Sequence, residues 1–335
     1  MTSNKVGLAL LGLGRIGQVH LKIILSSEQA NLLWVMEENI KIAEMVMKEH
    51  KMLGKIRVAS SDQFDDILLD TSVQGIFVCT PTDTHTALVR KALTARKAVF
   101  CEKPLSEELA DIQACYDDAE KYGATLFCAF NRHFDFGIRS MYEKARSGGL
   151  GKIYMVKTTF HDTPLWMGAP SLSQTFLIHD VDLLCWFADA LPDTVVVQAT
   201  ANIKEAAEKC DVDTVGILMR FPCGMLGILD FCRYSPYGYD VRLEVSGSAG
   251  MEVTDAKPLS LVKTYTPSYQ GAAQIHATFP ERFHQAYTSE QEHFLDVIQG
   301  KAELEVKRVF SERAAKVIDA IKESYKTGQV ITLKK

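Results

Sequence analysis

The sequence predicts an α/β protein of two domains, with a doubly wound parallel sheet in the first and an α+β arrangement in the second. Over the first 130 residues, short apolar runs alternate with helical patterns, as in successive βαβ units. A glycine-rich turn joins the first apolar run to the first helical pattern. After residue 130, β-rich runs follow one another, which predicts an antiparallel sheet with helices on one face. We therefore expect domains at residues 1–130 and 131–335.

Six short apolar runs form the expected sheet of the first domain. They are Val6–Leu11, Asn31–Met36, Ile56–Val58, Gln74–Cys79, Ala98–Cys101 and Thr125–Ala129. Between them, apolar residues recur at helical intervals in Ile16–Leu25, Ile40–His50, Phe64–Leu69 and Thr84–Ala95. A further helix is expected after Ser106, a candidate N-cap, and should stop at Gly123.

The second domain combines four helical patterns with longer β-rich runs. The helices are expected at Gly137–Ala145, Leu177–Phe187, Glu281–Ile298 and Ser311–Lys326. The strands are expected at Lys152–Phe160, Thr194–Ala201, Val215–Phe221, Met225–Cys232, Val241–Val245 and Ser260–Tyr265. A Pro222-Cys223-Gly224 turn predicts a hairpin between two of these strands.

Composition excludes several classes of protein. The 335 residues are 47% hydrophobic and carry a formal net charge of −5, which argues against binding to nucleic acid or an anionic membrane. No stretch approaches the ~20 apolar residues of a membrane span. The apolar run Val6–Leu13 is expected to be a buried strand rather than part of a signal peptide. The eight cysteines form no C-x-x-C pair, so we expect free thiols in a reducing cytoplasm and no metal.

The turn Gly12-Leu13-Gly14-Arg15-Ile16-Gly17 has the spacing of a dinucleotide-binding fingerprint. Gly12 permits a tight turn, Gly14 lets the backbone approach a pyrophosphate, and Gly17 lets the helix pack on the strand. The pyrophosphate would lie at the positive end of the helix. The first domain is therefore expected to be a Rossmann domain with cofactor contacts at Gly12, Gly14, Arg15 and Ile16.

Glu37 ends the second strand, twenty residues after Gly17. A carboxylate at this position accepts hydrogen bonds from the adenosine ribose hydroxyls. Glu38 adds a second negative charge, and no arginine follows at once, so a 2′-phosphate would be repelled. These residues favour NAD over NADP as the cofactor.

Several further motifs resemble the glucose–fructose oxidoreductase/inositol dehydrogenase (Gfo/Idh/MocA) family. Cys79–His85 has the order TPTxxH and Phe100–Leu105 contains EKP, and both are specific to that family. The resemblance covers nearly the whole chain, and within the family it is greatest to inositol 2-dehydrogenases. The later matching segments are Phe130–Asp135, His179–Asp182, Tyr237–Asp240, Gly247–Gly250 and Arg282–Tyr287.

The resemblance implies a two-domain NAD(P)-dependent oxidoreductase acting on a cyclic polyol or sugar such as an inositol. It implies a large open, mostly antiparallel sheet in the second domain, whose exposed face would pair subunits into a homodimer or homotetramer. The substrate would lie between the domains, over the nicotinamide. The family motifs place further cofactor contacts at Thr80, Pro81, His85, Glu102 and Lys103.

Two residues carry the chemistry that the resemblance implies. Lys103 would hydrogen-bond the reacting hydroxyl and stabilise the negative oxygen. His179 would be the general base, because imidazole can take and release a proton near neutral pH. Glu102 and Pro104 would fix the strand end that carries Lys103.

The sequence departs from the family pattern at Thr175, where relatives usually have an aspartate one helical turn before the histidine. A threonine can hydrogen-bond but supplies no charge to an imidazolium. Three alternatives follow: Asp162 or Asp180 could serve instead, His179 could act alone, or dehydrogenation could be weak or absent. The last alternative describes an NAD-binding sensor protein.

The residues expected to contact substrate hydroxyls are polar or aromatic, as a polyol site requires. They are Arg132, His133, His161, Asp162, Thr175, His179, Tyr237, Tyr239 and His284. His133 replaces the second arginine of a family pair, which could alter which polyol fits. Trp166 could shape the lip of this pocket or pack in the core. A nearer alternative activity is NADP-dependent reduction of a sugar or dihydrodiol carbonyl.

Overall fold

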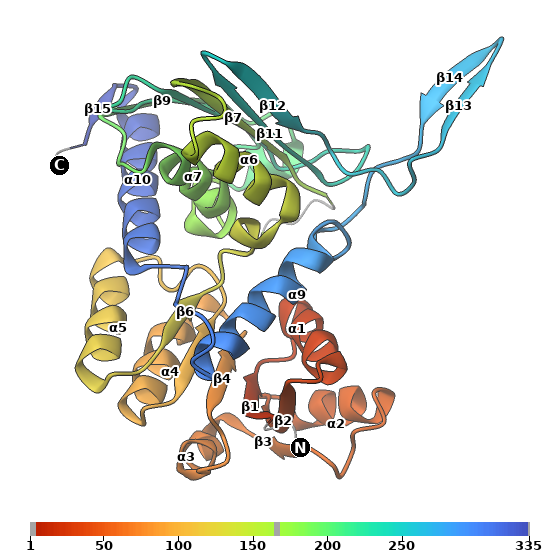
Figure 1. The fold of residues 1–335 in the computed structure, drawn as a ribbon, viewed down its shortest axis with the longest axis vertical. Coiled ribbons are helices and arrows are strands. Elements are labelled where there is room, and N and C mark those ends of the chain that lie inside the picture. The colour runs from red at the N-terminus through yellow and green to blue at the C-terminus, as the bar shows by residue number, and fades with distance from the viewer. Residues whose placement is uncertain (1–4, 164–167, 334–335) are drawn as a thin grey trace. The chain divides into compact units, whose positions relative to one another are not determined.

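A computed structural model of the chain describes residues 5–163 and 168–333 and divides them into two compact units (Figure 1). The first unit contains the residues up to Asn131 together with Gln285–Glu312. The second unit contains Arg132–His284 and the chain from Arg313 onward. The segment 285–312 thus belongs with the first unit, although it follows the second in sequence. Trp166 lies outside the described residues.

The first unit is built on a six-stranded parallel sheet with strand order β3-β2-β1-β4-β5-β6. This order reverses beside β1, as in a doubly wound fold, and it confirms the predicted class. All six expected strands are present, with bounds shifted by a few residues at most. They are β1 (Val6–Leu11), β2 (Ala30–Met36), β3 (Arg57–Ala59), β4 (Gly75–Val78), β5 (Ala98–Cys101) and β6 (Leu126–Cys128).

The expected helices of the first unit also form, with one correction. They are α1 (Arg15–Ser26), α2 (Ile40–Glu49), α3 (Phe64–Leu69), α4 (Thr82–Thr94) and α5 (Leu109–Tyr122). Gly123 ends α5 in the left-handed conformation, with φ of 60°, as predicted. Ser106 is not the N-cap, because α5 begins three residues later and Glu108 occupies the cap position. The Ser106 hydroxyl instead accepts the Glu108 N–H at 3.1 Å, which forms a local turn before the helix.

Helix α9 (Phe279–Ile298) covers one face of this sheet from Gln285 onward. It has a kink at Phe283, where φ is −110° and ψ is 16°. The Phe294 ring lies 5.5 Å from Phe77 of β4 and 5.6 Å from Phe100 of β5. His20 of α1 contacts the same two strand rings, so α1 and α9 cover the same face.

The second unit is built on a seven-stranded sheet with strand order β12-β11-β7-β10-β9-β8-β15. Its neighbours β7 and β10 run parallel and the other neighbouring pairs run antiparallel, so the sheet is mostly antiparallel as predicted. The predicted hairpin is confirmed, with Arg220 of β9 opposite Leu226 of β10. The strands are β7 (Ile153–His161), β8 (Thr194–Thr200), β9 (Thr214–Arg220), β10 (Leu226–Cys232), β11 (Asp240–Gly247), β12 (Gly250–Thr254) and β15 (Ile331–Thr332).

Helix α7 packs against one face of this sheet and leaves the other face open. Burial along β9 alternates strictly: Val215, Ile217 and Met219 are buried, and the residues between them are exposed. The helices of the unit are α6 (Phe136–Arg146), α7 (Gln174–Ala188), the short α8 (Lys204–Glu208) and most of α10 (Arg308–Thr327).

The strand expected at Ser260–Tyr265 forms outside the large sheet. It is β13 (Lys263–Thr266), which pairs with β14 (Tyr269–Ala272) in a separate two-stranded hairpin. Nearly all residues of this hairpin are exposed, so no alternating apolar face ties it to a core. Within residues 5–163 and 168–333, no helix has both the length and the apolar composition needed to cross a membrane.

Candidate functional site

The glycine turn between β1 and α1 has the geometry that its spacing predicts. Gly12 has φ of +90°, and a Cβ there would lie 2.7 Å from the Cys79 carbonyl oxygen. A Cβ on Gly17 would lie 2.1 Å from the Gly12 carbonyl oxygen, so only glycine lets α1 start this close to the strand. A Cβ on Gly14 would meet no atom within 4 Å. The space beside Gly14 is therefore open, in contrast to the space beside the other two glycines.

The open space beside Gly14 lies at the N-terminus of α1. The first backbone bond of the helix runs from the Gln18 N–H to the Gly14 carbonyl, at 3.0 Å. The amides of the preceding turn have no acceptor within the helix and carry the positive end of its dipole. An open space flanked by such amides fits a diphosphate.

Glu37 lies at the end of β2 and reaches across to the glycine turn. Its Oε2 accepts the Leu13 N–H at 2.8 Å, and its Oε1 accepts the Asn39 N–H at 3.2 Å. The side chain is half-exposed, so these backbone contacts fix the carboxylate while part of it remains accessible. A carboxylate held beside the glycine turn fits the position of an adenosine ribose.

His85 connects two loops at the carboxyl end of the same sheet. Its Nδ1 lies 2.8 Å from the Pro104 carbonyl oxygen, and its Nε2 lies 2.8 Å from the Thr80 carbonyl oxygen. Burial lowers the pKa of His85, although both carbonyl contacts act in the opposite direction. The predicted contact residues Thr80, Pro81 and His85 thus belong to one tethered segment, in which Pro81 is exposed and Thr80 is half-buried.

Glu102 and Lys103 follow β5 directly at this edge. The Glu102 side chain is buried, and its Oε1 lies 2.7 Å from His20 Nε2. Its Oε2 accepts the Lys103 backbone N–H at 3.1 Å. Lys103 is half-exposed, and the peptide bond between Lys103 and Pro104 is cis. The carboxylate of Glu102 therefore anchors the backbone of the predicted catalytic lysine.

In the second unit, Thr175 and His179 lie in the first turns of α7. They are four residues apart in a continuous helix, so their side chains share a face. Both are half-exposed, whereas the other residues of Ser171–Asp180 are buried. The predicted general base is thus accessible beside a threonine.

Arg132 and Asp180 form a buried ion pair behind this part of α7. One Nη of Arg132 lies 2.6 Å from Asp180 Oδ1, and both side chains are 1% exposed. Burial acts to lower the pKa of Arg132, but Asp180 and Tyr239 outweigh it and raise the pKa. Burial raises the pKa of Tyr239, and Arg132 opposes that rise. Asp180, one of the alternative partners for His179, is held by Arg132.

His133 lies in the core of the second unit. Its Nε2 is 2.5 Å from Asp182 Oδ2, and its ring stacks on Trp186 with the centroids 3.9 Å apart. Both members of the His133–Asp182 pair are buried. Asp182 lies three residues after His179 in α7, on the same side of the helix.

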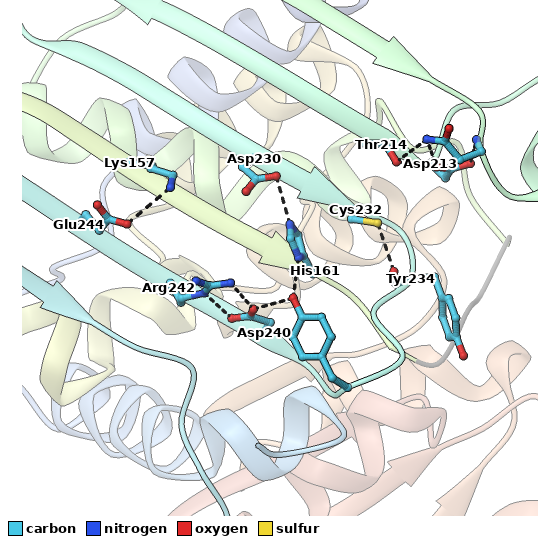
Figure 2. Close-up of polar contacts among 12 residues, drawn as sticks. Lys157, His161, Asp213, Thr214, Asp230, Cys232, Tyr234, Asp240, Arg242 and Glu244 are labelled. Carbon is cyan, nitrogen blue, oxygen red and sulfur yellow. Dashed lines mark hydrogen bonds and ion pairs between the residues drawn. The ribbon is translucent and has the colours of Figure 1, made fainter. Parts of the chain in front are cut away.

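A second polar cluster lies on the open face of the large sheet, at the end of β7 (Figure 2). His161 Nδ1 lies 3.0 Å from the Tyr237 hydroxyl, and its Nε2 lies 3.1 Å from Asp230 Oδ1. The Tyr237 hydroxyl donates to Asp240 Oδ2 at 2.9 Å, and Arg242 contacts both oxygens of Asp240. Hydrogen bonding to His161 lowers the pKa of Asp230.

The structure therefore places the predicted substrate residues of the second unit in two groups. Arg132 and Tyr239 lie with α7, on the covered side of the sheet, and His161 and Tyr237 lie on its open face. Asp162 follows His161 and is half-exposed, with its Oδ1 accepting the Thr163 N–H at 2.8 Å. His284 is exposed in α9.

Sequence reasoning missed the residues that hold these side chains. His20, Glu290 and Gln291 lie around Glu102, and Asp182 lies against His133. For Glu290 the sequence did carry a signal of burial. The glutamate takes a core position in the apolar stripe of α9, between Ala286 and Phe294.

Three comparisons with known proteins agree with this geometry. Residues 6–130 match the family described as "Oxidoreductase family, NAD-binding Rossmann fold", and residues 138–252 match the "GFO/IDH/MocA C-terminal domain". The chain is 31% identical to a myo-inositol 2-dehydrogenase of Thermotoga maritima, over 86% of each chain. It is 29% identical to an inositol 2-dehydrogenase of Rhizobium meliloti, over 89% of this chain and 90% of the relative.

Comparison with solved structures gives the same kind of match. The crystal structure of a putative myo-inositol dehydrogenase from Sinorhizobium meliloti superposes with a TM-score of 0.91 at 28% identity. That match covers 98% of this chain and all of the other. The similarity therefore extends over both units.

Proposed function

The chain belongs to the GFO/IDH/MocA oxidoreductase family, and from this membership we propose that it is an NAD-dependent dehydrogenase of cyclic polyols or sugars. It would transfer a hydride between a secondary alcohol and the nicotinamide. Inositol is the leading substrate class, because the relatives named above are inositol 2-dehydrogenases. The order of the sheet and the glycine turn fit the NAD-binding fold of that family.

One observation carries the proposal. The open space beside Gly14, the Glu37 carboxylate and the Lys103 strand end all lie at the carboxyl edge of one parallel sheet. Ligands of doubly wound folds bind at this edge, where the strand order reverses. A diphosphate, a ribose and a reacting hydroxyl would each find a matching group there. The proposed cofactor contacts are Gly12, Gly14, Arg15, Ile16, Glu37, Thr80, Pro81, His85, Glu102 and Lys103.

Bound NAD would supply the hydride acceptor, and the residues of the chain would handle the alcohol. Lys103 would donate a hydrogen bond to the reacting oxygen and stabilise the negative charge that develops on it. His179 would take the hydroxyl proton as the C–H hydride leaves, so the alcohol loses one hydride and one proton in all. The other proposed substrate contacts are Arg132, His133, Asp162, Thr175, Tyr237 and Tyr239.

Steady-state formation of NADH from a panel of inositols and aldoses tests this function. We expect turnover with at least one cyclic polyol, and a higher kcat/KM with NAD than with NADP. A higher kcat/KM with NADP would favour the alternative reductase of sugar or dihydrodiol carbonyls and would contradict the role of Glu37.

Thr175 favours a second candidate, a catalytically weak NAD-binding sensor. The threonine supplies no charge on the helix face that carries His179, and the adjacent Asp180 is paired with Arg132. Firm NAD binding in calorimetry without turnover of any compound in the panel would select the sensor.

We also propose that the open face of the large sheet joins subunits into a homodimer or homotetramer. Leu218 of β9 and Ile228 of β10 are cross-strand neighbours on this face, and Leu218 is 43% exposed. Sedimentation of the wild type as an oligomer, and of Leu218→Arg as a monomer, is the expected result; a monomeric wild type would refute it. A reducing cytoplasm suits the cysteines, five of which are buried free thiols.

A further inference from the structure

A cluster of buried polar side chains lies beneath Lys103 in the first unit. Single nitrogen or oxygen atoms of His20, Glu102 and Glu290 all lie within 4.8 Å of one another. His20 and Glu290 are 0% exposed and Glu102 is 6% exposed. Two carboxyl groups are thus held together in an apolar core, where two negative charges would be strongly unfavourable.

The packing of the unit explains how the sequence brings these groups together. Side chains alternate along β5, so Glu102 points to the same face as Phe100. Glu290 lies one helical turn before Phe294, whose ring packs on Phe100. His20 contacts Phe100 from α1, with the ring centroids 5.1 Å apart. The three polar groups therefore meet at the edge of a single aromatic core.

The hydrogen bonds of the cluster determine where its protons lie. Gln291 Nε2 donates to His20 Nδ1 at 2.6 Å, so Nδ1 is an acceptor. His20 Nε2 then carries the ring proton and donates it to Glu102 Oε1 at 2.7 Å. Glu102 Oε2 accepts the Lys103 N–H. Both oxygens of Glu102 therefore accept hydrogen bonds from groups of the chain.

Glu290 is left without such donors. Among the described residues, no N–H or O–H group donates a hydrogen bond to either of its carboxyl oxygens. Burial raises the pKa of Glu290 well above its usual value, and the charge of Glu102 raises it further. The Cys79 thiol also interacts with both carboxyl groups: burial raises the pKa of Cys79, and the charges of Glu102 and Glu290 raise it further. Glu102 and Cys79 are both acidic groups, so neither can supply a positive charge that would balance an ionised Glu290.

We propose that Glu290 is a positioning residue, a neutral carboxylic acid that shares its proton with Glu102 and thereby fixes the strand end that carries Lys103. The Glu102 carboxylate then receives hydrogen bonds from Glu290, His20 and the Lys103 backbone. Loss of the Glu290 donor would let Glu102 shift and would move the lysine relative to the reacting alcohol. The effect on turnover rests on the proposed function of Lys103, whereas the shared proton does not.

The two carboxyl groups and the histidine of this cluster could instead bind a divalent cation. The hydrogen bonds argue against it, because the Nε2 lone pair is absent when that nitrogen carries the proton. Elemental analysis of the purified protein decides between the two. A stoichiometric metal that is lost in Glu290→Gln would overturn the shared proton.

Infrared spectroscopy tests the proton directly and needs neither substrate nor activity. A protonated carboxylic acid has a C=O stretch at higher frequency than the carboxylate bands. At neutral pH we expect this band in the wild type and its loss in Glu290→Gln. Glu292→Gln, an exposed control in the same helix, should keep it. An unchanged band in Glu290→Gln would overturn the proposal.

Kinetics test the positioning role. Glu290→Leu removes the donor to Glu102 and should lower kcat by about tenfold or more, with the KM for NAD little changed. Glu290→Gln keeps an N–H donor and should recover most of that loss. Equal losses in both variants would leave no role for the donor. If the wild type turns over no polyol, the proposed function fails, and the infrared result still decides the state of Glu290.

Discussion

Thr175 and His179 lie one turn apart on the accessible side of α7, and both are half-exposed in a segment whose other residues are buried. A neighbouring carboxylate commonly orients the imidazole of a histidine base and stabilises its positively charged form. Here the neighbour is a hydroxyl, and the adjacent Asp180 pairs with Arg132 instead. The neighbour one turn before His179 is therefore neutral, and the carboxylate on the same side of the helix after it, Asp182, pairs with His133.

Thr175→Asp should raise turnover. The new carboxylate would stabilise the imidazolium of His179 and raise its pKa. We expect an increase in kcat of about tenfold or more, with the lower limb of the pH–rate profile moved to higher pH. Thr175→Asn is the matched neutral control. Equal rates for the two variants would show that charge at this position is unimportant.

Lys103→Ala should lower turnover and leave the affinity for NAD unchanged. The ammonium is proposed to act on the reacting oxygen, so its loss should cost about 10² or more in kcat. Calorimetry with NAD and steady-state rates on the same preparations provide the two measurements. Lys91→Ala removes an exposed lysine of the same unit and serves as the control. Unchanged turnover in Lys103→Ala would remove this residue from the mechanism.

Glu37→Ala should weaken NAD binding and favour NADP. A hydrogen bond to a charged group contributes about 1.5–3 kcal/mol, so the Kd for NAD should rise by about tenfold or more. Loss of the negative charge should at the same time lower the Kd for NADP. Glu38→Ala changes an exposed neighbour and should have little effect on NAD. If NADP binds no better to Glu37→Ala, the carboxylate does not set cofactor choice.

Two glycines of the same turn should respond in opposite ways to alanine. A Cβ on Gly14 enters open space, so Gly14→Ala should keep its melting temperature but bind NAD at least about tenfold more weakly. A Cβ on Gly17 would lie 2.1 Å from the Gly12 carbonyl oxygen, so Gly17→Ala should lose about 1–3 kcal/mol of stability. Thermal denaturation and calorimetry measure both effects. Undiminished NAD affinity in Gly14→Ala would place the diphosphate elsewhere.

Glu290 should make the stability of the protein depend on pH. Its pKa is raised by burial in the folded state, so folding takes up a proton wherever the unfolded carboxyl is ionised. The stability that this proton uptake contributes is complete below the pKa of Glu290 in the unfolded chain. It is lost as the pH rises toward the pKa of Glu290 in the folded protein. The melting temperature of Glu290→Gln relative to wild type should therefore increase from pH 5 to pH 8. A constant difference would mean that Glu290 is ionised in both states.

Local patterns were sufficient to predict the parallel sheet and the glycine turn of the first unit. The glycine turn, the strand before it and Glu37 all lie within 32 residues of one another, and their spacing is set by a single βαβ unit. Gly123 ended its helix as expected because the left-handed cap is a local preference. Ser106 failed as an N-cap because its hydroxyl had a competing backbone donor two residues away.

Long-range packing was not predictable from the same patterns. The periodicity of 281–298 predicts a helix, but the sheet on which it packs is set by Phe294 meeting Phe77 and Phe100. His20 is 82 residues from Glu102 and 271 residues from Gln291, so no motif contains the buried cluster. The apolar pattern of residues 260–265 predicted a strand, but it could not show that β13 would pair with β14 outside the large sheet.

Transfer of deuterium from substrate to cofactor tests the account most directly. Inositols and aldoses deuterated at their ring carbons would be incubated with the protein and NAD, and the recovered NADH would be analysed by mass spectrometry. The account predicts NADH that carries one deuterium from at least one cyclic polyol. NAD that binds in calorimetry but is recovered unreduced and unlabelled with every compound would contradict it.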